Sequence, residues 1–194
     1  MKPYRVAAPA IEPVSLDELK AAARVDFDDD DLILQSYLDA AVGYLDGWSG
    51  ILGRALINQN WGVSISNWPM QAIPLRFADV SSATVTYYDR DDVRQTLPSD
   101  AVEIVHRETG DLLYFRRSFT RPAVNDDRLA AIEVEFTTGY GDAPADVPAP
   151  IRTAILLLAC HLYENREATS TADNMQKLPL AVDALITPHR RVLF

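Results

Sequence analysis

The spacing of apolar residues changes twice along this chain, from a helical period to a period of two and back again. Near the N-terminus, apolar residues recur every three or four positions, which is typical of one face of an α-helix. Between about residues 55 and 138, apolar and polar residues alternate, as they do in strands with one buried face. After Pro150 the helical spacing returns. This order predicts an α+β fold with its strands gathered in the middle of the chain.

The first helix has a clear start signal. Ser15 stands three residues before Glu18, and this pair forms a capping box in which each side chain satisfies a free backbone N–H. Pro13 limits any extension toward the N-terminus. We therefore predict a short helix from Leu16 to about Arg24.

A second helix follows the acidic run at residues 28–31. Acidic side chains are favourable at the positive end of a helix dipole. The apolar stripe of this helix consists of Leu34, Leu38, Ala41, Leu45 and Trp48. We predict a helix of about 18 residues, ended by Gly50 or Gly53.

The middle of the chain alternates in three places that predict strands. The apolar members of these alternations are Val63 and Ile65, then Ala83, Val85 and Tyr87, and then Ile132, Val134 and Phe136. Turn signals separate them at residues 68–69, 89–92 and 109–111. Because no helical period interrupts them, we expect an antiparallel sheet or a small sandwich.

The third helical segment follows a proline-rich joint that contains Pro144, Pro148 and Pro150. Pro150 suits the first turn of a helix, where its missing N–H costs nothing. The stripe that follows consists of Ile151, Ala154, Ile155, Leu158, Ala159 and Leu162. We predict a helix to about Ala168, a loop over residues 169–177, and a short helix over residues 180–186 that Pro188 ends.

We therefore expect a single domain over residues 1–194. Residues 12–53 and 146–188 would supply about four helices from both chain ends, packed together as a helical base. Residues 54–140 would form a β-rich antiparallel insertion that projects from this base. Residues 189–194 would form a C-terminal tail.

Charge and cysteine content exclude several classes of protein. The chain has 28 acidic and 18 basic residues and a formal net charge of −10, so it lacks the clustered cations of a broad DNA-binding face. Cys160 is the only cysteine, so no internal disulfide is possible and nothing argues for secretion. The longest apolar run, residues 154–160, is far shorter than the roughly 20 residues of a membrane span. We expect a protein made inside the cell, without a membrane partner.

The aspartate run invites a comparison with calcium loops. Asp26, Asp28 and Asp30 match the first, third and fifth positions of an EF-hand loop. The glycine and glutamate that this loop needs are replaced by Asp31 and Tyr37. A cluster of charge at a helix start explains the run without a metal.

Other fragments of known motifs are also incomplete. His161 and Glu164 have the spacing of a helical metal pair, but a third ligand is missing nearby. Residues 139–141 lack the rest of a phosphate-binding loop. Cys160 lies in the apolar helix as a small core residue. We therefore predict no catalytic residue, no cofactor and no metal.

The C-terminal tail is basic and then apolar. It contains His189, Arg190, Arg191, Val192, Leu193 and Phe194. On an acidic body, such a tail could dock in trans on a partner subunit. A frayed C-terminus is the alternative that the residues leave open.

Taken together, the motifs resemble one family across nearly the whole chain. In order, they are Glu12 to Lys20, Asp30 to Ile33, Thr137 to Gly141, Asp146 to Arg152, His161 to Glu167, Leu178-Pro179 and Leu185 to Arg190. This set resembles the head–tail connector, or adaptor, proteins of long-tailed phages, prophages and gene transfer agents. The region from about Trp61 to Arg128 contributes less to the resemblance.

The resemblance implies a structural role without catalysis. Connector subunits form a ring, commonly of about twelve, beneath the portal protein, and this ring continues the DNA channel toward the stopper and tail. A terminal arm typically reaches the portal, so His189 to Phe194 become the candidate portal-binding residues. We assign Tyr163, Glu164, Asn165 and Arg166 as candidate ring-interface residues. The location implied is the neck of a virion or particle, with assembly in the bacterial cytoplasm.

The acidic composition fits this expectation. DNA must slide through the channel, and a lumen poor in Lys and Arg gives little nonspecific affinity for phosphate. Isolated subunits could be monomeric, since association carries a large entropic cost. The alternatives are another neck component, such as a stopper or tail-completion protein, or a small hydrolase that uses scattered carboxylates, for which the sequence offers no spaced constellation.

Overall fold

The structure is a computed structural model that describes residues 2–107, 109–165 and 180–191. Its contacts divide the chain into two compact units. The first, here called the β-unit, contains residues 1–10, 58–140 and 191–194. The second, here called the helical unit, contains residues 11–57 and 141–190. The described residues form an α+β protein with four α-helices and two antiparallel sheets, as the periodicity predicts.

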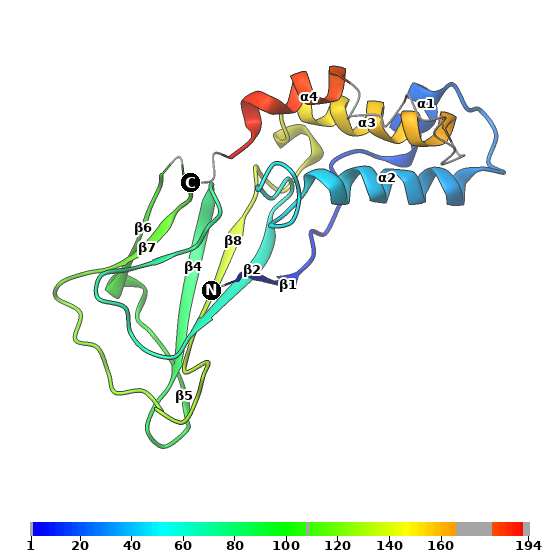
Figure 1. Cartoon of the computed structure of the whole chain (residues 1–194). Coiled ribbons are helices and arrows are strands. Elements are labelled where there is room, and N and C mark those ends of the chain that lie inside the picture. Colours follow the sequence, from blue (N-terminus) through cyan, green and yellow to red (C-terminus); the bar gives the residue numbers. More distant parts are fainter. Residues whose placement is uncertain (1, 108, 166–179, 192–194) are drawn as a thin grey trace, which may run out of the picture. The chain divides into compact units, whose positions relative to one another are not determined.

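The helical unit contains all four helices, which are labelled in Figure 1. They are α1 (Leu16–Ala23), α2 (Asp31–Leu45), α3 (Ala149–Glu164) and α4 (Leu180–Ile186). Helix α3 packs against the other three, so helices from the two parts of this unit share one core, as predicted. The buried side chains at its centre are Leu19, Leu34, Leu38, Ala41, Leu45, Ile151, Ala154, Ile155, Ala159, Val182 and Ile186.

The capping box at the start of α1 is confirmed. The Glu18 backbone N–H donates to Ser15 Oγ at 3.2 Å, and the Ser15 N–H donates to a Glu18 carboxylate oxygen at 2.8 Å. At the other end, Arg24 adopts a left-handed conformation with φ of 57°, which stops the helix at Ala23. Both ends thus match the prediction to within one residue.

The predicted ends of the next two helices are wrong. Helix α2 stops at Leu45, three residues before Trp48, because Asp46 turns to extended backbone with φ of −83° and ψ of 146°. The buried carboxylate of Asp46 accepts a hydrogen bond from the Leu56 N–H at 2.8 Å, which fixes this turn. Helix α3 ends at Glu164 rather than near Ala168. The predicted loop at 169–177 lies outside the described residues.

The described residues of the β-unit form eight strands in two sheets. Their bounds are β1 (Tyr4–Ala7), β2 (Gln59–Ile65), β3 (Ala72–Pro74), β4 (Val80–Tyr88), β5 (Arg94–Thr96), β6 (Val102–Val105), β7 (Leu112–Phe115) and β8 (Ile132–Thr138). The larger sheet has the order β1-β2-β8-β4-β5, and the smaller has the order β3-β7-β6. All pairings are antiparallel (Figure 1), as predicted.

The period of two in the sequence corresponds to the two faces of the larger sheet. On one face, Val63, Val134 and Val85 lie side by side and are buried. On the same face, Phe136 packs against Phe77, with ring centres 5.8 Å apart. Residues 75–77 continue the line of β3 and exchange hydrogen bonds with Asp111, next to β7. This face of the larger sheet is therefore covered by the smaller sheet and its flanking segments.

One part of the predicted arrangement needs correction, because the helices are not confined to the two chain ends. Strand β1 precedes α1, and Arg191 belongs to the β-unit after the last helical turn. A 3₁₀ turn also lies among the strands at Ser99–Ala101. The strand at residues 4–7 escaped prediction because its four residues are all exposed and carry no burial pattern. Within the described ranges, none of the helices has the length and apolar character that crossing a membrane requires.

Candidate interaction surfaces

The C-terminal segment begins as part of the folded structure. The carbonyl of His189 accepts a hydrogen bond from Arg54 Nε at 3.1 Å. Arg190 lies 3.7 Å from the Asp183 carboxylate, in a pair that is half exposed to solvent. Arg191 is buried. The remaining candidate portal-binding residues, Val192, Leu193 and Phe194, lie outside the described residues.

The described candidate ring-interface residues, Tyr163, Glu164 and Asn165, lie at the C-terminal end of α3, where two of them make contacts within the helical unit. The Tyr163 hydroxyl donates to the Asp30 carboxylate at 2.6 Å, which ties α3 to the start of α2. The Asn165 side chain donates to the His161 carbonyl at 2.9 Å and caps the helix. Glu164 is exposed, and Arg166 lies outside the described residues. Glu164 is thus the described member of this group that is most available to a partner.

An apolar groove of about 490 Å³ runs beside α3 in the helical unit. Leu156, Leu157 and Cys160 line it from α3, together with Ala22 of α1 and Ala181 of α4. Burial, and then the charge of Glu164, raises the pKa of the Cys160 thiol. A thiol with a raised pKa forms little of the thiolate that nucleophilic chemistry needs. This geometry suits packing rather than catalysis.

Two members of the aspartate run, Asp28 and Asp31, share one lysine. Lys20 Nζ lies 2.6 Å from the Asp28 carboxylate and 2.7 Å from that of Asp31. These hydrogen bonds hold the pKa of Asp28 below its ordinary value. In the part of the chain that the structure describes, no group of three His, Cys, Asp or Glu side chains is placed to hold a metal ion.

The outer face of the larger sheet carries a shallow hollow of about 230 Å³, here called the acidic sheet face. It is defined by Tyr4, Val6, Thr84, Glu133 and Glu135. Arg94 lies 3.1 Å from Glu133 and neutralises it, whereas exposed Glu135 makes no ion pair with any residue that the structure describes. Burial, followed by the charges of Glu133 and Glu135, raises the pKa of Tyr4. This face therefore combines exposed apolar side chains with one uncompensated carboxylate.

A glycine makes room for the aromatic ring on this face. Tyr4 of β1 pairs with Gly62 of β2, and the phenol ring lies across the glycine. A Cβ atom added at Gly62 would stand only 2.5 Å from Tyr4 Cζ. On the other side of the sheet, the Arg5 guanidinium lies 5.2 Å from the centre of the Trp61 ring. Both contacts hold β1 against β2.

A second charged surface lies where β7 ends and is here called the arginine loop, defined by Met70, Arg116 and Arg117. The Phe115 N–H donates to the Gln71 carbonyl at 2.9 Å, so Met70 is in the segment next to the end of β7. Met70 is 91% exposed. Arg116 reaches Glu103 at only 3.9 Å, and exposed Arg117 has no ion pair within the described residues. Trp68 anchors the segment, since its indole N–H donates to the Pro122 carbonyl at 2.7 Å. The surface therefore presents cations and one apolar side chain on a fixed support.

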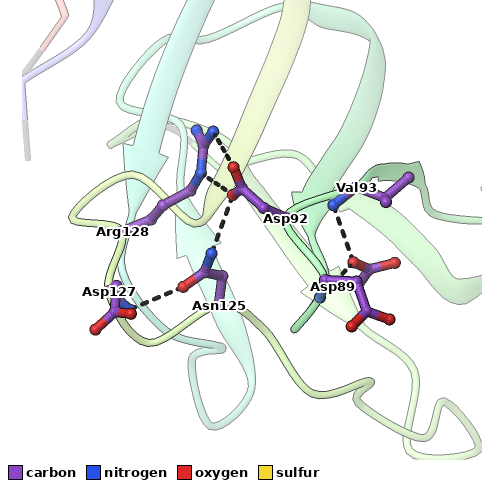
Figure 2. A network of polar contacts seen from close by, with 7 residues as sticks. Asp89, Asp92, Val93, Asn125, Asp127 and Arg128 are labelled. Atoms are coloured by element: carbon purple, nitrogen blue, oxygen red, sulfur yellow. Dashed lines mark hydrogen bonds and ion pairs between the residues drawn. The ribbon is translucent and has the colours of Figure 1, made fainter.

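The tip of the β4–β5 hairpin is held by the network of polar contacts in Figure 2. The Asp89 carboxylate accepts hydrogen bonds from the Val93 N–H at 3.0 Å and from the Gln95 side chain at 2.9 Å. Asp92 is gripped by Arg128, and the Asn125 side chain also donates to it at 3.0 Å. These contacts join the hairpin to the loop before β8.

Sequence reasoning found neither the acidic sheet face nor the arginine loop. The acidic sheet face depends on β1 pairing with β2, which lies more than fifty residues away. The arginines at 116, 117 and 121 were a visible signal, but the sequence does not show that Trp68 contacts this segment through Pro122.

The comparison with protein-family models gives one family. Residues 13–106 match the family described as phage gp6-like head-tail connector proteins. This match spans α1 and α2 of the helical unit and strands β2 to β6 of the β-unit. No curated protein matches the sequence.

Solved structures share the fold over the full length of the chain. One is a chain from the neck of an empty gene transfer agent particle, computed with C6 symmetry, with a TM-score of 0.79 and 22% identity. A chain from the virion of a native gene transfer agent particle gives the same values. A third, from the neck of a native particle computed with C12 symmetry, gives a TM-score of 0.73 and 23% identity. Each match covers 100% of this chain and 97% of the other.

The predicted resemblance is thus confirmed by a family match and by a likeness in fold that were obtained separately. The family is one of structural connectors and is not enzymatic. Just under half of the chain, residues 13–106, thus matches the phage gp6-like head–tail connector family.

Proposed function

We propose that this protein is a head–tail connector subunit that forms a ring in the neck of a phage-like or gene transfer agent particle. The observation that carries the proposal is the family match at residues 13–106. The fold shared with chains from gene transfer agent necks supports the neck as its location. Those necks were computed with C6 and C12 symmetry, which supports a cyclic assembly, and we propose about twelve subunits.

In this ring the protein would contact a portal protein above and a stopper or tail-completion protein below, so that capsid and tail are linked. The helical unit would form the body of the ring. Its shared core around α3 is a rigid support of the kind that such a body needs. Exposed Glu164, together with Arg166, would contact the neighbouring subunit.

The C-terminal residues His189 to Phe194 would bind the portal. Hydrogen bonding of His189 and burial of Arg191 fix the start of this segment on the folded chain. Such anchoring lowers the entropic cost of docking, because fewer residues are ordered on binding. The final Val192, Leu193 and Phe194 would supply apolar contacts.

DNA would pass through the channel without specific binding. The net charge of −10 argues against strong attraction to phosphate, since such attraction depends on clustered cations that release counterions. We propose that the surface lining the channel is neutral or negative. A measured surface potential with a broad basic lumen would contradict this part of the proposal.

Binding to purified portal protein tests the proposed position in the neck. The full chain should be captured by portal rings and not by tail tubes. A variant that lacks residues 192–194 should lose portal capture, whereas Leu129→Ala, which changes a 92% exposed side chain in the β-unit, serves as a matched control and should keep it.

The same experiment separates the alternatives. Capture by tail tubes alone would identify a stopper or tail-completion protein instead. The hydrolase alternative would be favoured if neither portal rings nor tail tubes captured the chain and if the chain had a hydrolytic activity that is lost on substitution of a single carboxylate.

A further inference from the structure

We propose that the acidic sheet face of one subunit binds the arginine loop of the next subunit in the ring. This inference rests on the proposed ring function and names the surfaces that would join one copy of the chain to another. It places the contact in the β-unit, in addition to the contacts proposed for the helical unit.

The first argument is the orientation of Glu135 within the larger sheet. Glu135 and Phe136 are consecutive residues of β8, so their side chains point to opposite faces. Phe136 packs against Phe77, on the side that the smaller sheet covers. Glu135 therefore points away from the smaller sheet.

The arginine loop belongs to that smaller sheet. Arg116 and Arg117 directly follow Phe115, the last residue of β7. The Phe115 ring contacts Trp68, whose ring centre is 5.6 Å away on the covered side. The two charged surfaces thus belong to different sheets, and one subunit does not pair Glu135 with Arg117.

The second argument is charge. Arg94 neutralises Glu133 at 3.1 Å, which leaves Glu135 as the net charge of the acidic sheet face. Arg117 is the corresponding uncompensated charge of the arginine loop, since Arg116 is within 3.9 Å of Glu103. Among the residues that the structure describes, neither Glu135 nor Arg117 forms an ion pair. Opposite charges of this kind steer association and fix its register.

The third argument is the apolar surface beside each charge. Tyr4 and Val6 are 46% and 47% exposed beside Glu135, and Met70 is 91% exposed on the arginine loop. Burial of exposed apolar side chains supplies affinity that a solvent-exposed ion pair does not. Gly62 holds the Tyr4 ring flat on the acidic sheet face, so part of the contact is preformed.

The symmetry of the contact follows from these surfaces. Because the two surfaces differ, the contact joins unlike patches and is heterologous. A heterologous contact builds a ring when its rotation closes. A second copy of this chain is therefore the occupant that both surfaces fit.

Cross-linking with engineered cysteines tests the proposed pair. Cys160 is first replaced by Ala, so that no native thiol competes. Two full-length variants of this chain then carry Glu135→Cys or Arg117→Cys. When they are mixed and oxidised, with and without portal protein, we expect a disulfide-linked dimer of one with the other, whereas each variant alone should give none.

A chain that carries both cysteines should form a ladder of multimers. The matched control mixes Arg117→Cys with Asp126→Cys, because Asp126 is equally an exposed acid of the β-unit but lies outside the acidic sheet face. The inference would be overturned if the yield of the dimer linked between residues 135 and 117 were no greater than the yield in this control, both with and without portal protein. Self-dimers of either single variant would also overturn it, since they indicate contact between like surfaces.

Charge reversal provides a second measurement. In the chain without engineered cysteines, Glu135→Arg or Arg117→Glu should each lower the yield of ring-size oligomer by about fivefold. This is the effect expected from the loss of one exposed ion pair. The combined variant should recover it. Asp126→Arg and Arg90→Glu change the net charge equally and should have no such effect.

The result also separates this inference from the proposed function. Rings that form on the portal without any cross-link between 135 and 117 would leave the connector function standing and remove only this contact. Failure to bind the portal or to form any ring would count against the proposed function itself.

Discussion

Arg128 forms a bidentate ion pair with both carboxylate oxygens of Asp92, with Nε 2.5 Å from Oδ1 and Nη2 3.1 Å from Oδ2. The same guanidinium lies 3.6 Å from the centre of the Tyr88 ring. Asp92 has a φ of 61°, in the left-handed region that few residues other than glycine adopt without cost. The pair therefore holds a strained hairpin tip in place.

This relationship predicts a pH dependence for Arg128→Ala. Hydrogen bonding by Arg128 lowers the pKa of Asp92, so the pair stabilises the fold above the ordinary carboxyl pKa of about 4 and the contribution is lost as pH falls through the lowered value. The variant should unfold at a lower temperature than the natural chain at neutral pH. The difference should narrow as pH falls from about 4 toward the lowered pKa of Asp92, and it should vanish once Asp92 is protonated in the folded chain as well.

Thermal unfolding followed by circular dichroism across this pH range measures the effect. Arg90→Ala, which removes an exposed arginine from the same hairpin, is the control and should change little. If the difference in unfolding temperature between Arg128→Ala and the natural chain stayed constant at all pH values, the ion pair would contribute nothing. Only the packing of Arg128 on Tyr88 would then stabilise the tip.

Two leucines of α2 give a second prediction. Leu38 is fully buried, whereas Leu32, six residues earlier, is 90% exposed. Leu38→Ala should lower the free energy of unfolding by about 2–5 kcal/mol, since it leaves a cavity among α-helices. Leu32→Ala should change it by less than about 0.5 kcal/mol. Chemical denaturation measures both, and equal effects would contradict the assigned face of the helix.

The contact of Tyr4 with Gly62 gives a third prediction. Gly62→Ala places a methyl group 2.5 Å from Tyr4 Cζ and should destabilise the chain by about 1 kcal/mol or less, because the ring must move but is half exposed and free to turn outward. In a Tyr4→Ala background the same change should cost much less, since no ring is left to displace. A double-mutant cycle measures this coupling, and additive effects would show that the ring does not lie on Gly62.

The capping box at the start of α1 gives a fourth prediction. Ser15→Ala should cost about 1 kcal/mol, because the Glu18 N–H loses its acceptor at the start of α1. Ser118→Ala changes an exposed serine outside any helix and should be close to neutral. If both variants had the same stability in urea titrations, the cap would have no role in holding α1.

The elements predicted correctly from the sequence are those with local signals. Ser15 and Glu18 lie three residues apart, so their capping box is readable without knowledge of the rest of the chain. The start of α3 is set by Pro150, and its apolar stripe repeats over about three turns. The alternation around Val134 likewise reports one buried face of β8.

The elements that were missed depend on distant partners. Helix α2 stops at Leu45 because the Asp46 carboxylate binds the N–H of Leu56, a contact that periodicity does not reveal. Gly50, predicted as a stop, instead lies where any side chain would meet the backbone carbonyl of Asp46. Strand β1 depends on β2. Neither candidate surface of the β-unit could be found before these pairings were known.

Particles made without this protein test the central claim, that it acts as a structural link in the neck rather than by chemistry. Electron microscopy should show heads that are filled with DNA or leaking it and that carry no tails. Supplying the natural chain should restore tailed particles. Normal numbers of tailed, infectious or transferring particles in its absence would contradict the account.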